Sequence, residues 1–163
     1  MRGVGGWARA RTVRLIDWPF VKVADAVALA GHEVHVCRYR EARALLRWLG
    51  PGDLRGLRVL DVAGGDGYWA GQARKRGARA VALDLATSKL RYGRQLASSP
   101  ALIEGDALQL PFADASFDRV MSICAIEHFD DGEKALDEMT RVLAPGGELV
   151  MSADALTLAE HWP

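Results

Sequence analysis

Three aspartates stand where short apolar runs of the sequence end: Asp61, Asp84 and Asp106. A carboxylate accepts hydrogen bonds, and it can accept from both hydroxyls of a ribose or from an amine. Glycine lets the backbone turn sharply and lets a ligand approach main-chain N–H groups closely. These residue types, at these places, predict a site for a nucleoside-type ligand. The glycines that follow the first acid are Gly64, Gly65 and Gly67.

Each acid would meet a different part of one adenosyl ligand. Asp84 would accept from the ribose hydroxyls, and Asp106 from the exocyclic amine of adenine. Asp61 would repel a pyrophosphate because like charges repel, and it suits an ammonium group instead. The dinucleotide fingerprint G-x-G-x-x-G also differs in spacing, because Tyr68 follows Gly67 directly. An NAD-type oxidoreductase is therefore the disfavoured alternative.

The secondary-structure elements expected around these acids are strands and helices in alternation. Strands alternating with helices of this length predict βαβ units and a parallel sheet with helices on both faces. Ligands of such sheets bind at the carboxyl ends of the strands, where the acids stand. Thr87 or Ser88 is the expected N-cap of one helix. Strands are expected at 58–62, 80–83, 101–104, 118–123 and 148–152, and helices at 34–49, 68–76, 87–97 and 132–143.

Composition excludes several classes of protein. The 163 residues predict one domain, and a formal net charge of zero gives no reason to expect a nucleic-acid or membrane-surface partner. No apolar run approaches the roughly 18 residues of a membrane span. Cys37 and Cys124 are far apart without metal-type spacing, which predicts a reduced, cytoplasmic protein and no metal site.

The first residues are basic, and residues 1–17 are expected to form a loosely ordered arm. The predicted division is an N-terminal arm and helical lead-in at 1–33, followed by the ligand-binding domain at 34–163. An organelle-targeting peptide is the less favoured reading of the arm. Asp137 and Arg141 are spaced as an i,i+4 ion pair on a helix.

From about Leu57 to Ala153 the chain resembles the class I S-adenosylmethionine-dependent methyltransferases. Residues 59–67 are similar to the family's first motif. Asp84 occupies the position at which the family has its ribose-binding acid. Residues 105–118 resemble the adenine-contacting segment of small-molecule methyltransferases that are similar to quinone-biosynthesis enzymes. The segments 127–129 and 141–147 also resemble that subgroup.

The resemblance implies a Rossmann-like α/β fold and S-adenosyl-L-methionine as the cofactor. It implies methyl transfer to a small-molecule acceptor through an O, N or C nucleophile. His128 is the candidate general base, with a structural loop histidine as the alternative. No Asn/Asp-Pro-Pro-aromatic segment follows the fourth predicted strand, which argues against methylation of nucleic-acid bases. The implied cofactor-binding residues are Asp61, Ala63, Gly64, Gly65, Gly67, Asp84, Leu85, Asp106, Ala107 and Cys124. Trp69 and Tyr68 are expected to pack, and Tyr39 or Arg40 are candidates to reach the cofactor carboxylate.

The chain departs from the family pattern at two places. Ala63 replaces the first glycine of the loop, and alanine penalises a positive φ. Beyond the fifth predicted strand the family continues with a helix and a β-hairpin, whereas about ten residues remain here, of which 156–162 are a possible helix start. A C-terminally truncated chain is expected, with the fifth strand as an open edge that a homodimer or a partner chain would cover. An inactive or partner-dependent cofactor-binding fragment is the alternative function.

Overall fold

The computed structural model describes residues 12–16, 47–49, 54–95 and 100–152. Most of the predicted helix at 34–49 lies outside these residues, as do Cys37, Tyr39, Arg40 and the segment 156–162. The division into 1–33 and 34–163 therefore stays a prediction.

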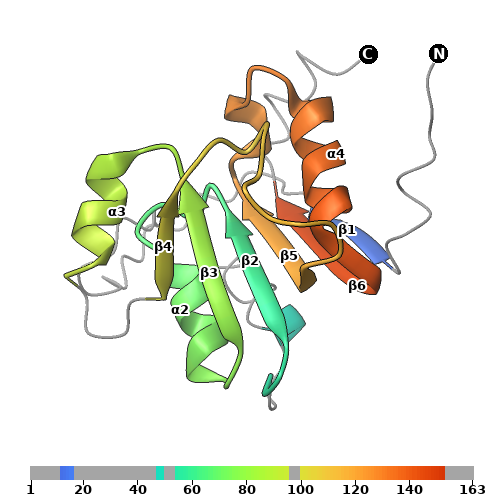
Figure 1. Ribbon diagram of the computed structural model, residues 1–163, viewed down its shortest axis with the longest axis horizontal. Helices are drawn as coiled ribbons and strands as arrows, with labels where there is room; N and C mark the ends of the chain where they lie inside the picture. Colours follow the sequence, from blue (N-terminus) through green and yellow to red (C-terminus); the bar gives the residue numbers. More distant parts are fainter. Residues whose placement is uncertain (1–11, 17–46, 50–53, 96–99, 153–163) are drawn as a thin grey trace, which may run out of the picture.

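A six-stranded, wholly parallel sheet forms the centre of the described structure (Figure 1). Its strand order is β1-β6-β5-β2-β3-β4, so β2 lies inside the sheet between β5 and β3. The predicted parallel α/β fold is confirmed, with one strand more than the five expected. The strands are β1 (Thr12–Ile16), β2 (Arg58–Val62), β3 (Arg79–Asp84), β4 (Ala101–Glu104), β5 (Phe117–Ile123) and β6 (Leu143–Ser152).

Two helices cover opposite faces of the sheet. Leu60 and Val62 of β2 pack in the same core cluster as Leu136 and Met139 of α4. Val59, whose side chain alternates to the other face, packs with residues of α2 in a second cluster. The third α-helix, α3, lies against β3 and β4. The helices whose bounds lie within the described residues are α2 (Tyr68–Lys75), α3 (Thr87–Gly93), α4 (Gly132–Val142) and the one-turn 3₁₀ helix η3 (Ile126–His128), and residues 47–49 are also helical.

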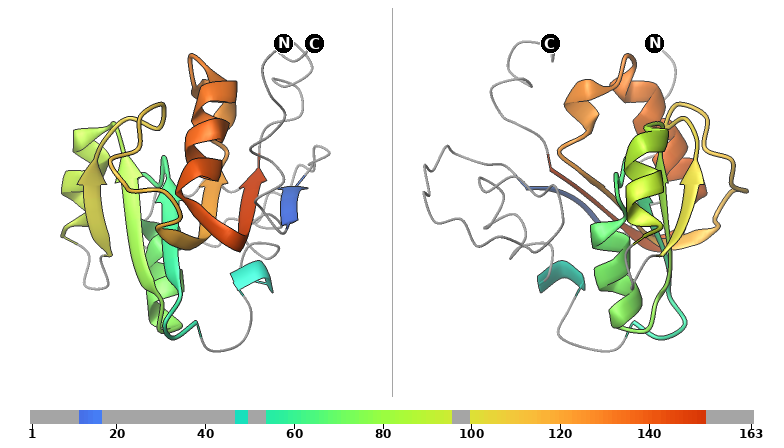
Figure 2. Two further views of the ribbon diagram at one scale, coloured as in Figure 1. Left: turned by 45° about the vertical axis from the view of Figure 1, so that its right-hand side comes forward. Right: turned by 90° about the vertical axis from the view of Figure 1, so that its left-hand side faces the viewer.

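The expectation of a loose arm is wrong for residues 12–16. Thr12–Ile16 is a strand that pairs in parallel with Glu148–Ser152 of β6, and Figure 2 shows β1 (blue) beside β6 (red). Pairing with β1 satisfies backbone groups that an edge strand would leave open. The strand was not predicted because basic residues interrupt its β-branched and apolar residues, which are Val13, Leu15 and Ile16.

The predicted open edge on the fifth strand is therefore also wrong. That strand corresponds to β6, and this chain covers its edge with its own β1. The edge no longer gives a reason to expect a homodimer or partner chain.

Arg141 makes different contacts from the expected pair with Asp137. Its guanidinium donates to Glu138 at 2.7 and 2.8 Å, to Asp114 at 2.9 Å, and to the carbonyl oxygens of Leu110 and Phe112 at 3.0 and 2.8 Å. Glu138 in turn accepts from the Leu110 N–H at 2.7 Å. This network ties the long loop after β4 to α4, and the spacing of charges along one helix could not reveal it.

Candidate functional site

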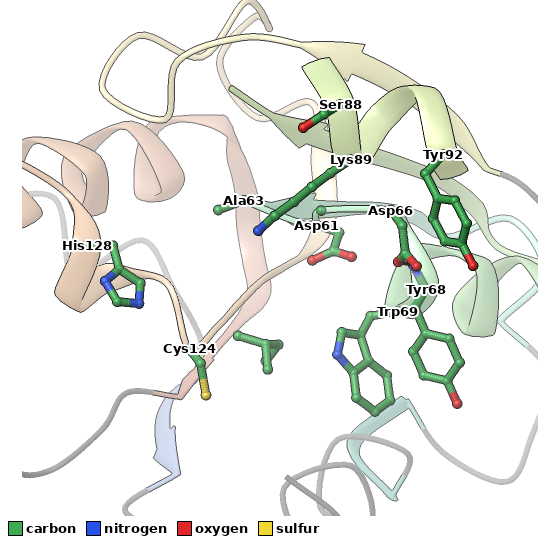
Figure 3. A pocket seen from close by; sticks show the side chains of 13 residues that line it. Asp61, Ala63, Asp66, Tyr68, Trp69, Ser88, Lys89, Tyr92, Cys124 and His128 are labelled. Carbon is green, nitrogen blue, oxygen red and sulfur yellow. Dashed lines mark hydrogen bonds between the residues drawn. The ribbon is translucent and has the colours of Figure 1, made fainter. Parts of the chain in front are cut away.

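A cavity of about 550 Å³ opens at the carboxyl ends of β2 and β5 (Figure 3). This is the edge at which open parallel sheets bind ligands, and a volume of about 300–1,000 Å³ is usual for small-molecule sites. Three parts of the chain line it: the glycine loop with the start of α2, the first turns of α3, and the segment after β5. The lining residues are Asp61, Ala63, Gly64, Gly65, Asp66, Tyr68, Trp69, Ser88, Lys89, Tyr92, Ile123, Cys124 and His128.

The structure brings part of the predicted set together on this cavity. The predicted residues that line it are Asp61, Ala63, Gly64, Gly65, Cys124 and His128. The others lie around it without lining it, and these are Gly67, Asp84, Leu85, Asp106 and Ala107. Gly67 instead begins α2 with a φ of 79°, and an added Cβ would lie 2.6 Å from the Leu102 side chain.

Asp84 holds the glycine loop in place. Its carboxylate accepts from the Gly65 N–H at 2.7 Å and from the Ala86 N–H at 2.7 Å. The second bond lies at the start of α3, whose N-cap is Ala86 and not Thr87 or Ser88 as predicted. An ionised carboxylate has about four acceptor sites, so these two bonds leave capacity for ribose hydroxyls. The ribose role stays a prediction.

Asp106 also bonds to nearby backbone. Its Oδ1 accepts from the Leu108 N–H at 2.8 Å, which is the self-capping turn typical of aspartate. Ala107 is buried in the core, whereas the Leu85 side chain is 70% exposed. The adenine-binding role of this group stays a prediction.

Close packing explains why glycine stands at two positions near the cavity. A Cβ on Gly64 would lie 2.7 Å from the Asp61 carboxylate. On the facing helix, a Cβ on Gly93 would overlap the backbone carbonyl oxygen of Asp66. Gly93 was not predicted, although Lys89 and Gly93 are four residues apart and so share one face of α3. This spacing could have indicated which face of α3 lies toward the glycine loop.

Two residues other than glycine bend the backbone at the cavity. Ala63 has a φ of 56° and Cys124 a φ of 47°. Such left-handed conformations cost roughly 1–2 kcal/mol without glycine. Ala63 therefore keeps the loop's turn despite its methyl group. Cys124 is held by N–H bonds to the Ser152 carbonyl and hydroxyl oxygens at 2.9 and 3.0 Å.

The walls differ in character. Figure 3 shows His128 and Cys124 on one side of the cavity, and Tyr68 and Tyr92 on the opposite side. Trp69 lies between, and it also packs in the core as predicted, with its ring 4.8 Å from that of Tyr68. His128 ends η3, so a proton-accepting side chain lies on the cavity wall after β5.

Asp61 is the buried carboxyl group of the site. Its side chain is 1% exposed, and its Oδ2 accepts from the Ala70 N–H at 3.2 Å. Burial raises the pKa of Asp61 from 3.8 to about 8, opposed by the Ala70 bond and reinforced by the nearby Asp84 and Asp66. No cationic side chain of the described residues lies within ion-pair distance of this carboxyl group. A ligand cation would stabilise its ionised form.

This shift in the pKa of Asp61 sets a testable pH dependence. The folded protein keeps a proton on Asp61 that the unfolded chain releases between about pH 4 and 8. The stabilisation is full below about pH 4 and is lost as the pH rises toward 8. The free energy of unfolding of the wild type should therefore fall relative to Asp61→Asn between pH 5 and 8, by at most about 1.4 kcal/mol per pH unit. Urea titrations at several pH values measure it.

A difference between the two proteins that stays constant over this range would contradict the Asp61 assignment. Two other carboxyl groups do not interfere, because their pKa values move the other way. Arg58 lowers the pKa of Asp118, and Arg141 lowers that of Glu138. Their contributions are lost only as the pH falls through the acid range below their ordinary values.

Two kinds of feature are absent from the described residues. They contain no group of three or more His, Cys, Asp or Glu side chains that could hold a metal ion. They also contain no helix that is long and apolar enough to cross a membrane.

Comparison with known proteins gives a consistent result. Residues 60–151 match the model of a family described as a methyltransferase domain. The demethylmenaquinone methyltransferase of Renibacterium salmoninarum is 42% identical over 101 residues, which are 62% of this chain and 43% of that protein. The chain spans about half the length of the curated relatives it matches.

Solved structures agree in fold. The crystal structure of PH0226 from Pyrococcus horikoshii gives a TM-score of 0.63 at 31% identity, covering 76% of this chain and 62% of that one. An arsenic(III) S-adenosylmethionine methyltransferase from Chlamydomonas reinhardtii gives a TM-score of 0.56 at 32% identity, covering 61% and 39%.

Proposed function

The chain belongs to the methyltransferase domain family, and from this membership we propose that its cavity binds S-adenosyl-L-methionine for methyl transfer to a small-molecule acceptor. The observation that carries the proposal is Asp61. A buried carboxyl group with a raised pKa lies on the cavity wall under a glycine loop, and no described cation pairs with it. S-adenosylmethionine brings an ammonium group that would meet this need.

The residues present fit this cofactor. The absent side chain of Gly64 lets the loop backbone pack directly against the Asp61 carboxyl group, since a Cβ there would lie 2.7 Å from it. The main-chain N–H groups of the loop can face a ligand without an intervening side chain. Asp84 would accept from the ribose hydroxyls, and Asp106 would accept from the adenine amine.

When bound, the cofactor supplies a methyl group already activated on a sulfonium. The protein then has to bind, orient and exclude water, and placing two reactants in line is a large part of such catalysis. His128 lies on the cavity wall after β5 and would accept the proton of an acceptor hydroxyl or amine. Cys124 lines the same cavity and would contact the cofactor.

The acceptor class rests on the relatives. One is named for demethylmenaquinone, and another, from Erwinia pyrifoliae, for malonyl-[acyl-carrier protein]. We propose a small organic acceptor that carries an O, N or C nucleophile. A neutral formal charge favours neither a nucleic-acid nor a membrane-surface partner. Homodimer formation and a cytoplasmic location stay predictions.

Calorimetry with both cofactor classes tests the proposal. S-adenosylmethionine and its product S-adenosylhomocysteine are expected to bind with one site per chain, and NADH to bind more weakly or not at all. Tighter binding of NADH would favour the dinucleotide alternative and overturn the proposal.

Turnover separates an enzyme from a binding-only chain. Radiolabelled S-adenosylmethionine and a panel of quinols, phenols, amines and carboxylic acids are expected to give a methylated product. Cofactor binding without transfer to any acceptor would favour the inactive or partner-dependent alternative.

A further inference from the structure

Lys89 extends across the glycine loop into the cavity. It stands on the first turns of α3, and its Cδ lies 3.6 Å from where a Gly65 Cβ would be. Figure 3 shows its ammonium end pointing into the cavity, toward the side on which Ala63 and Asp61 lie. The 3.6 Å distance is an ordinary van der Waals contact, so the Lys89 stem packs directly against the glycine loop.

The Lys89 ammonium makes no ion pair with any carboxylate of the described residues, although Asp61 and Asp66 line the same cavity. The side chain is exposed to the cavity and does not belong to either core cluster. A lysine that stabilises neither a helix end nor an ion pair, and that points into a binding site, is placed to meet a ligand.

A lysine and a carboxyl group that a ligand cation would ionise thus face one cavity from two walls. Asp61 belongs to β2, and Lys89 belongs to α3 on the other side of the glycine loop. An amino-acid group carries both an ammonium and a carboxylate, so it matches this pair of residues in one orientation only. We propose that Lys89 binds the carboxylate at the amino-acid end of the ligand while Asp61 accepts from its ammonium. The proposal rests on the proposed function, because it assumes a ligand with such an end.

A phosphate ligand fits the same cavity less well. Lys89 would attract a phosphate, but Asp61 and Asp66 line the same cavity and would repel one. A ligand with a cation alone also fits less well, since Lys89 would repel it with no compensating carboxylate. A zwitterionic end offers a carboxylate to Lys89 and an ammonium to Asp61, so it gives both residues a partner.

The test compares two ligands that differ only at this end. S-adenosylhomocysteine carries an aminocarboxypropyl chain on its sulfur, which supplies the amino-acid group. In 5′-methylthioadenosine a methyl group replaces this chain. Lys89→Met should weaken S-adenosylhomocysteine about 3- to 10-fold, as for a partly exposed charge pair, and should change the affinity for methylthioadenosine less than 2-fold. Lys89→Arg, which keeps the charge, should retain most of the affinity. Calorimetric titration measures each dissociation constant.

Lys134→Met is the matched control, because Lys134 is an exposed lysine on α4 that does not line the cavity. It should change neither affinity. An equal loss for both ligands in Lys89→Met, or no loss for either, would overturn the Lys89 assignment while leaving cofactor binding intact. Absence of S-adenosylhomocysteine binding by the wild type would instead overturn the proposed function, and the Lys89 assignment with it.

Discussion

Gly93→Ala is expected to destabilise the protein by about 2 kcal/mol or more and to weaken ligand binding at the glycine loop. The new Cβ would overlap the Asp66 carbonyl oxygen and lie 2.8 Å from the Leu102 side chain. Backbone cannot yield as a flexible side chain does, so α3 or the loop must move, and overpacking of this kind costs about 1–3 kcal/mol or more. Helix propensity favours alanine by up to about 1 kcal/mol, so a net loss would report the packing. Urea unfolding measures it.

Gly132→Ala is the matched control, since Gly132 also belongs to a helix, α4. A Cβ there would make only an ordinary contact, 3.6 Å from Ile126. This variant is expected to be as stable as the wild type or slightly more stable. If Gly93→Ala unfolds at the same urea concentration as Gly132→Ala, the close approach of α3 to the glycine loop is wrong.

Asp84→Ala is expected to weaken binding of S-adenosylhomocysteine by about 1.5–3 kcal/mol, or about 10- to 150-fold. Hydrogen bonds to a charged group contribute about this much. Two effects add here. The variant loses the proposed ribose acceptor, and it also loses the bonds from Gly65 and Ala86 that hold the loop. Calorimetry measures the affinity, and an affinity equal to that of the wild type would refute the role of Asp84.

A thermodynamic cycle separates the two effects of Asp84. The 2′-deoxy analogue of S-adenosylhomocysteine lacks one ribose hydroxyl and should bind the wild type more weakly than the parent ligand. Asp84→Ala should bind the two ligands almost equally, because the hydroxyl has lost its acceptor. If the variant penalises the deoxy analogue as strongly as the wild type does, Asp84 only positions the loop.

Apolar runs and punctuating glycines were enough to predict the sheet. The strands at 58–62 and 101–104 have the predicted bounds, because short buried strands between turn residues are unambiguous at this length. The N-terminal strand Thr12–Ile16 was missed, since its apolar residues are interspersed with basic ones and its pairing partner lies more than a hundred residues away. Only tertiary pairing identifies an edge strand of that kind.

The site was predictable as a location and less so as a set of contacts. Strand ends and the glycine loop placed Asp61 and Gly64 on the cavity, because the carboxyl ends of parallel strands meet at one edge. The bonds from Asp84 and Asp106 to backbone N–H groups depend on loop conformation, which the sequence pattern does not encode. Lys89 comes from a helix face whose orientation is set by packing against the loop.

An amide NMR titration with S-adenosylhomocysteine tests the central claim most directly. Uniformly ¹⁵N-labelled protein is expected to show saturable shifts at the amides of Gly64 and Gly65, and smaller ones at Lys89 and His128. These residues line the proposed cofactor cavity from three parts of the chain. Unchanged glycine-loop amides at saturating ligand, or shifts of those amides with NADH alone, would contradict the account.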